Sequence, residues 1–513
     1  MLEARTLWEL IEKRAEATPD GLFAVDEDER RLSFSEFKIE AEKCAAGLMA
    51  LGVGEGTPVS WILPSWLEAL VLSAALSRLG AIQNPILPIY RHREVGFALK
   101  QTGARLVIVP GKFRGFDYTG MANELAVDLP GLQVLEVNRD LPQGDSSTLP
   151  APAGLTASGE APVRWIFYTS GTTADPKGAR HTDETVMVAG RGLVRVCEMD
   201  ENDRIALVFP VTHVGGAGWM MAGLLVGAAQ IAIAVFDPKT TVSVLSRHGV
   251  TQATAGTAFH QVYLEAQRQS PGTPVFPDIR SFPGGGAPKP PQLHYDIKKE
   301  MGGAGIVSGY GLTECPIVAM NGIRDPDEKL ANTEGSANPP DEMQIRIVKQ
   351  DDTLAGVGEE GEVRVKGPQL CKGYLDPKLN EKAFDAEGFF RTGDLGNLDA
   401  EGFLTITGRL KDVIIRKGEN ISAKEIEDLL YQHPKVADVA AIGLPDPKSG
   451  ERCCAVVQCR DAADPFEFDE MVAFLKGQNL MLQKIPEQLE IVDEIPRNPT
   501  GKILKHELRE RYS

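Results

Sequence analysis

The sequence has few cysteines, and their spacing is not typical of a disulfide framework or a zinc site. Seven cysteines are spread over 513 residues; Cys453 and Cys454 are adjacent, and Cys459 has no set of histidines or cysteines beside it. We therefore expect reduced, mostly buried thiols and a cytoplasmic protein.

Basic residues are also scarce. Lysine and arginine number 54 against 72 aspartate and glutamate residues, which leaves a formal net charge of −18. Such a chain lacks the basic surface with which proteins bind a phosphate backbone, so we expect no nucleic-acid partner. The simplest explanation of the negative net charge is that it keeps the protein soluble.

A transmembrane segment is missing as well. The chain opens with Met1, Leu2 and Glu3 and has no apolar core behind them, so we expect no signal peptide. One long uncharged stretch, residues 214–236, contains several glycines and ends in a β-type run at 231–235. This pattern favours a buried helix followed by a buried strand over a membrane span.

What the sequence does contain is a regular alternation of strand and helix signals. Ser33 and Glu36 form a capping-box pattern at the start of an apolar helical repeat. A strand at 59–63, a helix at 67–79 and a buried strand at 106–109 follow it. Such alternation predicts an α/β domain of layered sheets and helices, and residues 142–162, rich in proline and glycine, read as a loop.

The last hundred residues have a different pattern, with short elements and a small apolar set of their own. The expected elements are helices at 424–431 and 468–475 and strands at 439–444 and 454–459. We therefore predict two domains, a large N-terminal α/β domain over 1–408 and a small α+β C-terminal domain over 409–513.

The strongest local signal runs from Tyr168 to Gly178. An apolar strand-like run precedes it, and the segment then brings together four serine and threonine residues, two glycines and Lys177. Backbone N–H groups, hydroxyls and a lysine suit a loop that wraps phosphate. The segment is not a P-loop, because Gly178 follows the lysine. The alternative interpretation is an ordinary surface turn.

This segment resembles the phosphate-binding signature of the adenylate-forming superfamily, which contains acyl-CoA synthetases, firefly luciferase and the adenylation domains of peptide synthetases. Five further motifs of that family follow in its order, and six ordered matches are hard to attribute to coincidence. They are Gly284-Gly285-Gly286-Ala287-Pro288, Tyr310-Gly311-Leu312-Thr313-Glu314, Thr392-Gly393-Asp394, Gly408-Arg409-Leu410-Lys411-Asp412 and Pro499-Thr500-Gly501-Lys502.

The resemblance implies a nucleotide site and assigns residues to it. Tyr310 would stack on adenine, Asp394 would bind the ribose hydroxyls, Thr313 would bond a phosphate, and Glu314 would hold Mg²⁺. The full set of implied ATP and coenzyme A contacts is Thr169, Ser170, Gly171, Thr172, Thr173, Lys177, Gly286, Ala287, Tyr310, Asp394, Arg409, Lys411 and Gly418.

The resemblance also implies a two-step mechanism. Lys502 would bridge the acid and the α-phosphate while an acyl-adenylate forms. The small, mobile domain would then rotate about a hinge near Lys411, so that Gly418 enters the thiol channel and coenzyme A takes the acyl group. His213 would stand at the gate between the acid and that channel.

Three positions depart from the family pattern. Ala174 replaces a glycine, which could stiffen the phosphate loop, and Lys417 stands where the family often has glycine. The segment 212–216 is less aromatic than the usual substrate gate but keeps its histidine.

Other functions stay open at this stage. An amino-acid-activating domain that loads a carrier protein would place an aspartate near the gate, and residues 211–221 contain no acid. A luciferase-like oxygenase is not excluded. A non-catalytic binding protein would have no reason to keep Lys502, Glu314, Asp394 and Lys177 together.

The substrate is the least determined feature. The segment around Lys417, together with residues 88–90 and 114–118, resembles ligases of the cyclohexanecarboxylate and medium-chain type, so we expect a medium-chain, alicyclic or aromatic acid. Residues 211–218 would form a hollow wall of its pocket, and Ala217→Trp would then shift preference to short linear acids. Close helix packing explains the same small residues equally well. The oligomeric state is left open, a homodimer being one option.

Overall fold

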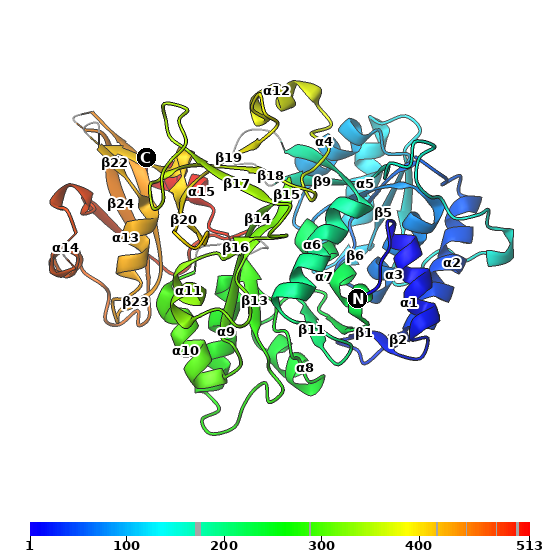
Figure 1. Cartoon of the computed structure of the whole chain (residues 1–513), viewed down its shortest axis with the longest axis horizontal. Helices are drawn as coiled ribbons and strands as arrows, with labels where there is room; N and C mark the ends of the chain where they lie inside the picture. Colours follow the sequence, from blue (N-terminus) through cyan, green and yellow to red (C-terminus); the bar gives the residue numbers. More distant parts are fainter. Residues whose placement is uncertain (170–175, 287–288, 417–418, 448, 479, 499–501) are drawn as a thin grey trace.

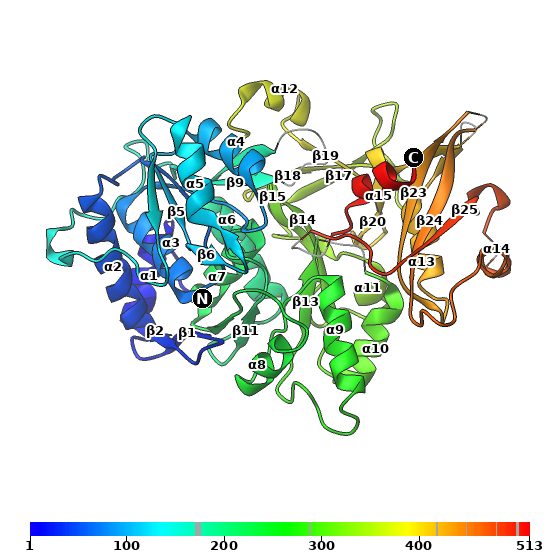
Figure 2. The ribbon, with the colours of Figure 1, turned by 180° about the vertical axis from the view of Figure 1, so that it is seen from behind.

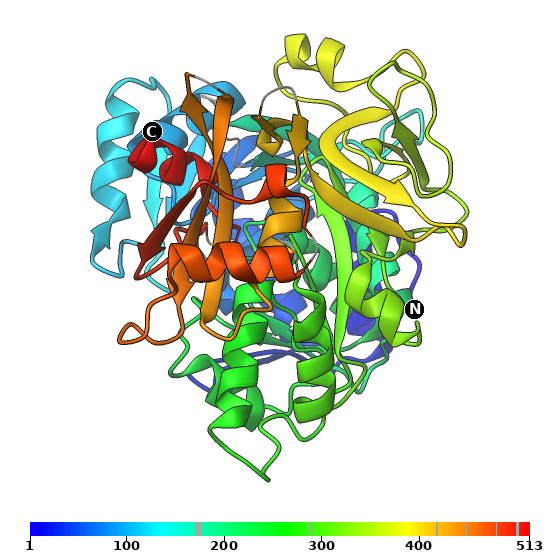
Figure 3. The same ribbon diagram turned by 90° about the vertical axis from the view of Figure 1, so that its left-hand side faces the viewer.

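The computed structural model describes residues 1–169, 176–286, 289–416, 419–447, 449–478, 480–498 and 502–513. Most of the chain forms a large body of sheets and helices, and the C-terminal hundred residues form a small unit at one end of it (Figure 1). This is the predicted α/β body with a small α+β unit, and the view onto the small unit in Figure 3 shows its sheet lying across the end of the larger body.

The phosphate-loop segment belongs to a six-stranded sheet of order β10-β9-β4-β3-β5-β8, parallel except for β10. Its strands are β3 (Pro58–Trp61), β4 (Ile82–Pro85), β5 (Leu106–Val109), β8 (Gln133–Glu136), β9 (Val163–Thr169) and β10 (Lys177–Thr182). The helices between them are α3 (Leu67–Leu79), α4 (His92–Thr102) and α5 (Tyr118–Val127). The expected elements at 59–63, 67–79 and 106–109 are therefore confirmed.

The predicted capping box is present at α2 (Phe34–Ala50). The Ser33 hydroxyl accepts the Glu36 N–H at 3.2 Å, and the Glu36 carboxylate accepts the Ser33 N–H at 2.8 Å. The helix ends at Ala50, with Leu51 as its C-cap and the left-handed Gly52 after it. Two unpaired donors at the helix start are thereby satisfied.

A second, four-stranded sheet of order β11-β12-β1-β2 contains the long apolar segment. Its strands are β1 (Leu22–Asp26), β2 (Arg31–Ser33), β11 (Arg204–Leu207) and β12 (Ala229–Ala232). Residues 214–236 form helix α7 (Val214–Val226) and then β12, which begins two residues earlier than expected because Ala229 pairs with Arg204. Among the described residues, none of the helices combines the length and apolar character needed to cross a bilayer.

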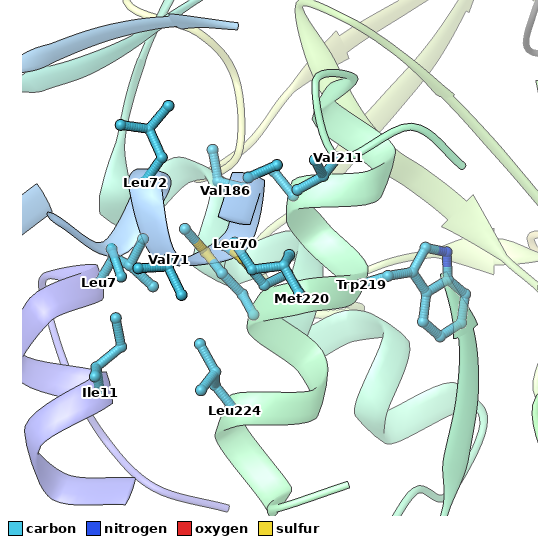
Figure 4. Close-up of a cluster of buried hydrophobic side chains, with 14 of the residues drawn as sticks. Leu7, Ile11, Leu70, Val71, Leu72, Val186, Val211, Trp219, Met220 and Leu224 are labelled. Atoms are coloured by element: carbon cyan, nitrogen blue, oxygen red, sulfur yellow. The ribbon is translucent and has the colours of Figure 1, made fainter. Parts of the chain in front are cut away.

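The largest core surrounds α7, which is buried along most of its length. It packs against α1 (Leu7–Ala17), α3 and α6 (Asp183–Val196). Figure 4 shows side chains from these helices converging, among them Leu7, Ile11, Leu70, Val71, Val186, Met220 and Leu224. The glycines and alanines of α7 allow the close approach of α6 that this packing needs.

Besides the two-stranded pair of β6 (Lys112–Phe113) and β7 (Phe116–Asp117), the large body contains two further sheets. One has the order β13-β14-β15-β16, and the other has the order β17-β18-β19-β20 (Figure 2). Their strands are β13 (Phe282–Gly285), β14 (Ile306–Leu312), β15 (Cys315–Met320), β16 (Ser336–Ala337), β17 (Gln344–Val348), β18 (Gly361–Lys366), β19 (Phe390–Leu398) and β20 (Leu404–Arg409). Nearby helices are α8 (Thr241–Arg247), α9 (Thr257–Arg268), α10 (Pro291–Met301), α11 (Asp327–Asn332) and the short α12 (Asn380–Ala383).

The small unit has one five-stranded sheet with an apolar core on each face. Its strands are β21 (Ile414–Arg416), β22 (Glu419–Ile421), β23 (Val436–Asp446), β24 (Gly450–Cys459) and β25 (Gln488–Val492). Helices α13 (Ala423–Leu430) and α14 (Phe468–Gly477) cover one core, and α15 (Lys505–Tyr512) covers the other. Both cores contain only residues from Ile414 onward, which agrees with the expected separate core. The exact boundary after residue 408 stays a prediction.

All seven cysteines lie in described parts of the chain and none forms a disulfide. Six are buried, and Cys459 is half-buried. The expectation of reduced, mostly buried thiols agrees with this arrangement.

Candidate active site

The hydroxyl-rich loop joins two antiparallel strands. Thr169 ends β9, Lys177 begins β10, and the two residues face each other in the ladder. The strand pair therefore holds both ends of the loop in a fixed place. Other predicted contacts in this loop lie outside the described residues, together with the Ala174 departure; they are Ser170, Gly171, Thr172 and Thr173.

Thr313 and Glu314 form the two-residue turn between β14 and β15, since Leu312 pairs with Cys315. The Glu314 carboxylate is buried and accepts the Tyr374 hydroxyl at 2.5 Å. Burial raises the pKa of Glu314, while the hydroxyl bond and the nearby Lys177 oppose that shift. The ammonium of Lys177 lies 5.5 Å from the centre of the Tyr374 ring.

Two positioning residues of this turn were missed by the sequence analysis. Tyr374 reaches Glu314 because its segment pairs with β10, where the Leu375 N–H donates to the Gly178 carbonyl at 2.8 Å. His181 donates from Nε2 to the Thr313 carbonyl at 2.9 Å, and burial lowers its pKa to about 4. His181 lies in a largely polar strand, Lys177 to Thr182, and nothing in that stretch of sequence marks it out.

The glycine-rich segment after β13 is a close contact between backbones. A Cβ on Gly285 would lie 2.3 Å from the Gly309 carbonyl of β14, so only glycine fits there. Gly286 has φ +80°, a left-handed conformation that glycine adopts without strain. Ala287 lies outside the described residues.

Predicted nucleotide residues from five separate motifs meet in one cleft of about 360 Å³. The cleft lies between the large body and the small unit, and both contribute to its walls. The predicted residues that line it are Gly286, Tyr310, Asp394, Arg409, Lys411 and Lys502.

Asp394 is held from two sides. Its Oδ2 accepts the Tyr310 hydroxyl at 2.7 Å, and its Oδ1 accepts Arg409 Nε at 2.9 Å. The second contact follows from strand pairing, because Asp394 of β19 faces Arg409 of β20. A carboxylate offers about four acceptor positions, so Asp394 keeps capacity for further donors.

Lys502 enters the cleft from the small unit. Burial, together with the charges of Arg409 and Lys411 and against the opposing effect of Asp394, lowers its pKa to about 7. Ion pairs on either side anchor its segment: Arg497 to Asp438 at 2.6 Å and Lys505 to Glu427 at 2.7 Å. The cation is therefore held in a crowded, poorly hydrated position.

A partly buried group of charged side chains between the two units was also missed. Lys424 of α13 binds Asp428 at 2.5 Å and lies near Glu334 of the large body. Glu334 is partly buried; desolvation raises its pKa, and its carboxylate accepts the Ile406 N–H at 3.1 Å. Lys289 lies close enough to influence this group, and burial lowers its pKa to about 8.

His213 and Thr313 meet at a second cavity of about 10 Å³, close to the space that one water molecule needs. His213 precedes α7, and its Nδ1 accepts the Gly215 N–H at 3.1 Å. Burial lowers the pKa of His213 to about 4, so the ring is neutral near pH 7. Because Nδ1 accepts, Nε2 carries the proton.

For its glycine-rich half, the expected hollow wall stays a prediction that the described contacts do not support. Thr212, His213 and Val214 line the small cavity, but residues 215–218 do not. Ala217 is fully buried in the main core, and a Cβ on Gly190 of α6 would lie 3.2 Å from the Gly218 carbonyl. Close helix packing therefore explains these small residues.

The remaining predicted sites concern the thiol channel and the metal. Gly418 and Lys417 lie outside the described residues. Within the described ranges, no group of three or more histidine, cysteine, aspartate or glutamate side chains could hold a metal ion. A single carboxylate such as Glu314 still suits Mg²⁺, which commonly takes one or two carboxylates and completes its shell with phosphate and water.

Comparisons with known proteins agree with this geometry. Residues 11–375 match the family model described as AMP-binding enzyme, and residues 425–502 match the AMP-binding enzyme C-terminal domain. A medium-chain fatty-acid–CoA ligase of Escherichia coli (strain K12) is 29% identical over 97% of this chain and 89% of its own. A salicyl-AMP ligase / salicyl-S-ArCP synthetase of Mycobacterium tuberculosis is 32% identical over 98% of this chain and 90% of its own. The crystal structure of ATP-bound MatB from Rhodopseudomonas palustris superposes with a TM-score of 0.87 at 27% identity, covering 98% of this chain and 99% of that one.

Proposed function

The chain belongs to the AMP-binding enzyme family, and from that premise we propose that it activates a carboxylic acid with ATP and passes the acyl group to coenzyme A. The observation that carries the proposal is the cleft between the two units. Residues from distant motifs meet there with the chemistry that a nucleotide requires: an aromatic ring, a carboxylate and three cations. They are Tyr310, Asp394, Arg409, Lys411 and Lys502.

In the first step, a carboxylate oxygen of the acid attacks the α-phosphorus of ATP and displaces pyrophosphate. Lys502 places a cation where negative charge builds on the α-phosphate, and Asp394 receives the ribose hydroxyls. Lys177 and the loop that it ends hold the leaving pyrophosphate. Positioning and electrostatic stabilisation account for the rate enhancement of such a step.

Glu314 would hold Mg²⁺, with phosphate oxygens and water as the other ligands. When bound, the ion supplies charge neutralisation for the phosphates. Tyr374 orients the Glu314 carboxylate, and His181 keeps the backbone of the turn in place through Thr313.

In the second step, the thiol of coenzyme A attacks the acyl carbon and AMP leaves. We propose that the small unit first rotates about Lys411, so that Lys502 leaves the cleft and Gly418 enters the thiol channel. A glycine there lets the pantetheine arm pass close to backbone. His213, neutral and protonated on Nε2, stands between the acid and this channel.

For the substrate we propose an organic acid of the medium-chain, alicyclic or aromatic class. The names of relatives support activation of medium-chain fatty acids and of salicylate by this family.

Loading of a carrier protein is the second candidate for the acceptor step. It is favoured by the salicyl-S-ArCP synthetase among the relatives. Adenylate formation is common to both candidates, so they differ only in the thiol that receives the acyl group.

One assay separates these possibilities. Pyrophosphate release is measured with a panel of acids, with and without coenzyme A. We expect turnover to require coenzyme A and to yield the acyl-CoA thioester. Adenylate formation that coenzyme A never discharges would favour a carrier protein, and no pyrophosphate with any acid would contradict the proposed activity.

A further inference from the structure

Two hydroxyl groups in the small cavity beside His213 have no hydrogen-bond partner. Thr212 Oγ1 and the Tyr90 hydroxyl are each buried from solvent and unpaired among the described residues. Thr212 itself is only 2% exposed. Buried polar groups in native proteins are nearly always hydrogen-bonded, so an unpaired pair in one cavity indicates that something binds there.

Neighbouring tyrosines show that the local fold can satisfy such groups. Tyr168, which lines the same cavity, donates its hydroxyl to Gln101 at 2.8 Å. Tyr118, nearby in the fold, donates to the carbonyl of Pro88 at 2.6 Å. Tyr90 and Thr212 thus differ from these two tyrosines; other described side chains such as Trp66 and Tyr263 also have an unpaired buried atom, but they do not line this cavity.

The charge of the cavity limits what it can bind. None of its described lining residues is an aspartate, glutamate, lysine or arginine. His213 is neutral, and burial raises the pKa of Tyr90 to about 12, so the phenol keeps its proton. If the bound acid carried a second carboxylate or an ammonium group, that charged group would lose its hydration in the cavity without gaining a counter-charge. An uncharged hydrogen-bonding group fits.

The position of the cavity links it to the reaction. Thr313, which precedes the buried Glu314, and His213 both line it. Its volume of about 10 Å³ matches a group the size of one hydroxyl and leaves no room for a longer chain.

We propose that Tyr90 and Thr212 are specificity-determining residues that bind an uncharged polar substituent, a hydroxyl being the best fit, on the carboxylic acid substrate. This inference rests on the proposed function and refines it. The preferred acids are hydroxylated chains or rings, and their unsubstituted parents and dicarboxylates are poorer substrates.

The test compares acids in matched pairs that differ by one hydroxyl group. The pairs are benzoate against each of its three monohydroxy isomers, and hexanoate against 6-hydroxyhexanoate. In the wild-type enzyme we expect kcat/KM for at least one hydroxylated acid to exceed that of its parent by about 10² or more, because a site built for a hydroxyl rejects the analogue without it.

The variants remove one hydroxyl at a time. Thr212→Val and Tyr90→Phe should each lower the ratio of kcat/KM for the hydroxylated acid to kcat/KM for its parent at least about tenfold. Thr212→Ser, which keeps the hydroxyl, should retain this ratio. Tyr118→Phe is the matched control, since its hydroxyl already has a partner, and it should leave the ratio unchanged.

A ratio near one for every pair in the wild type, or an unchanged ratio in both hydroxyl-deletion variants, would overturn the inference and leave a bound water as the partner of these groups. Calorimetric binding of the same pairs to the protein with a non-hydrolysable ATP analogue measures the ratio without turnover. Absence of thioester formation would thus count against the proposed function, while the binding ratio would still test the hydroxyl site.

Discussion

Lys502 lies among other cations, and this crowding explains both its depressed pKa and its suitability for the reaction. Arg409 and Lys411 repel its charged form, and burial removes water from around it. An incoming ATP brings negative charge to the same place and would favour the protonated ammonium. The cleft is therefore prepared for a polyanion.

Replacing Lys502 by alanine should separate the two half-reactions. Adenylation should fall by at least about 10²–10³-fold, the usual loss when one stabilising group is removed from a charge-forming step. Thioester formation from synthetic acyl-adenylate and coenzyme A should be spared. Both rates are measured in single-turnover experiments. A comparable fall in both would show that Lys502 does not belong to adenylation alone.

The pH dependence gives an independent check on the same residue. Lys502 is charged below its pKa of about 7 and neutral above it, so kcat/KM for ATP in the adenylation step should decline as pH rises through that value. In Lys502→Arg the guanidinium stays charged, and this decline should disappear. If kcat/KM for ATP declines in the same way in Lys502→Arg, the group that titrates is another residue.

Tyr374 acts through Glu314. Removing its hydroxyl in Tyr374→Phe takes one bond from a buried carboxylate and frees it to turn away from the metal position. We expect the Mg²⁺ concentration for half-maximal adenylation to rise about tenfold, as is usual for partners of metal ligands. Excess Mg²⁺ should restore kcat; a loss that Mg²⁺ does not restore would point to damage elsewhere in the fold.

At the scale of elements, α7 shows why a sequence pattern can have two meanings. Small residues in a helix allow either a hollow pocket wall or the close approach of another helix, and composition does not distinguish them. Only the contacts of Gly190 with α7 decide for packing. His213, which lies just before the helix, lines the small cavity, and its role at the gate stays a prediction.

Ala217→Trp should therefore act on stability. Trp has no space in the core around α7, and overpacking of this kind typically costs about 1–3 kcal/mol. Urea unfolding should show this loss. Val127→Trp on α5, where the side chain is 81% exposed, is the control and should change stability by less than about 0.5 kcal/mol. A stable Ala217→Trp protein with altered acid preference would restore the pocket-wall interpretation.

At the scale of the whole molecule, local patterns predicted the elements and the order of the motifs. The helix at 67–79, the strand at 106–109 and the capping box at Ser33 needed only neighbouring residues to be read. Tyr374, His181 and the Lys424–Glu334 contact were missed because each depends on segments far apart in the chain. No local spacing records such contacts.

The proposed hinge is also a property of the whole chain. Lys411 lies in the short turn η3 (Leu410–Asp412) between β20 and the small unit. Lys411→Pro restricts φ at this point and should hold the units in one orientation. We expect adenylation to be partly retained and thioester formation to be lost, measured as separate half-reactions. Equal loss of both with a lowered Tm would indicate misfolding.

Because both units line the cleft, ATP binding and the orientation of the small unit relative to the large body belong to one thermodynamic cycle. Anything that favours an orientation in which Lys502 has left the cleft weakens ATP affinity by some factor, and ATP disfavours that orientation by the same factor. A partner that binds only the outer surface of the small unit would then act as an allosteric inhibitor or activator of ATP binding. It would need no contact with the nucleotide at all.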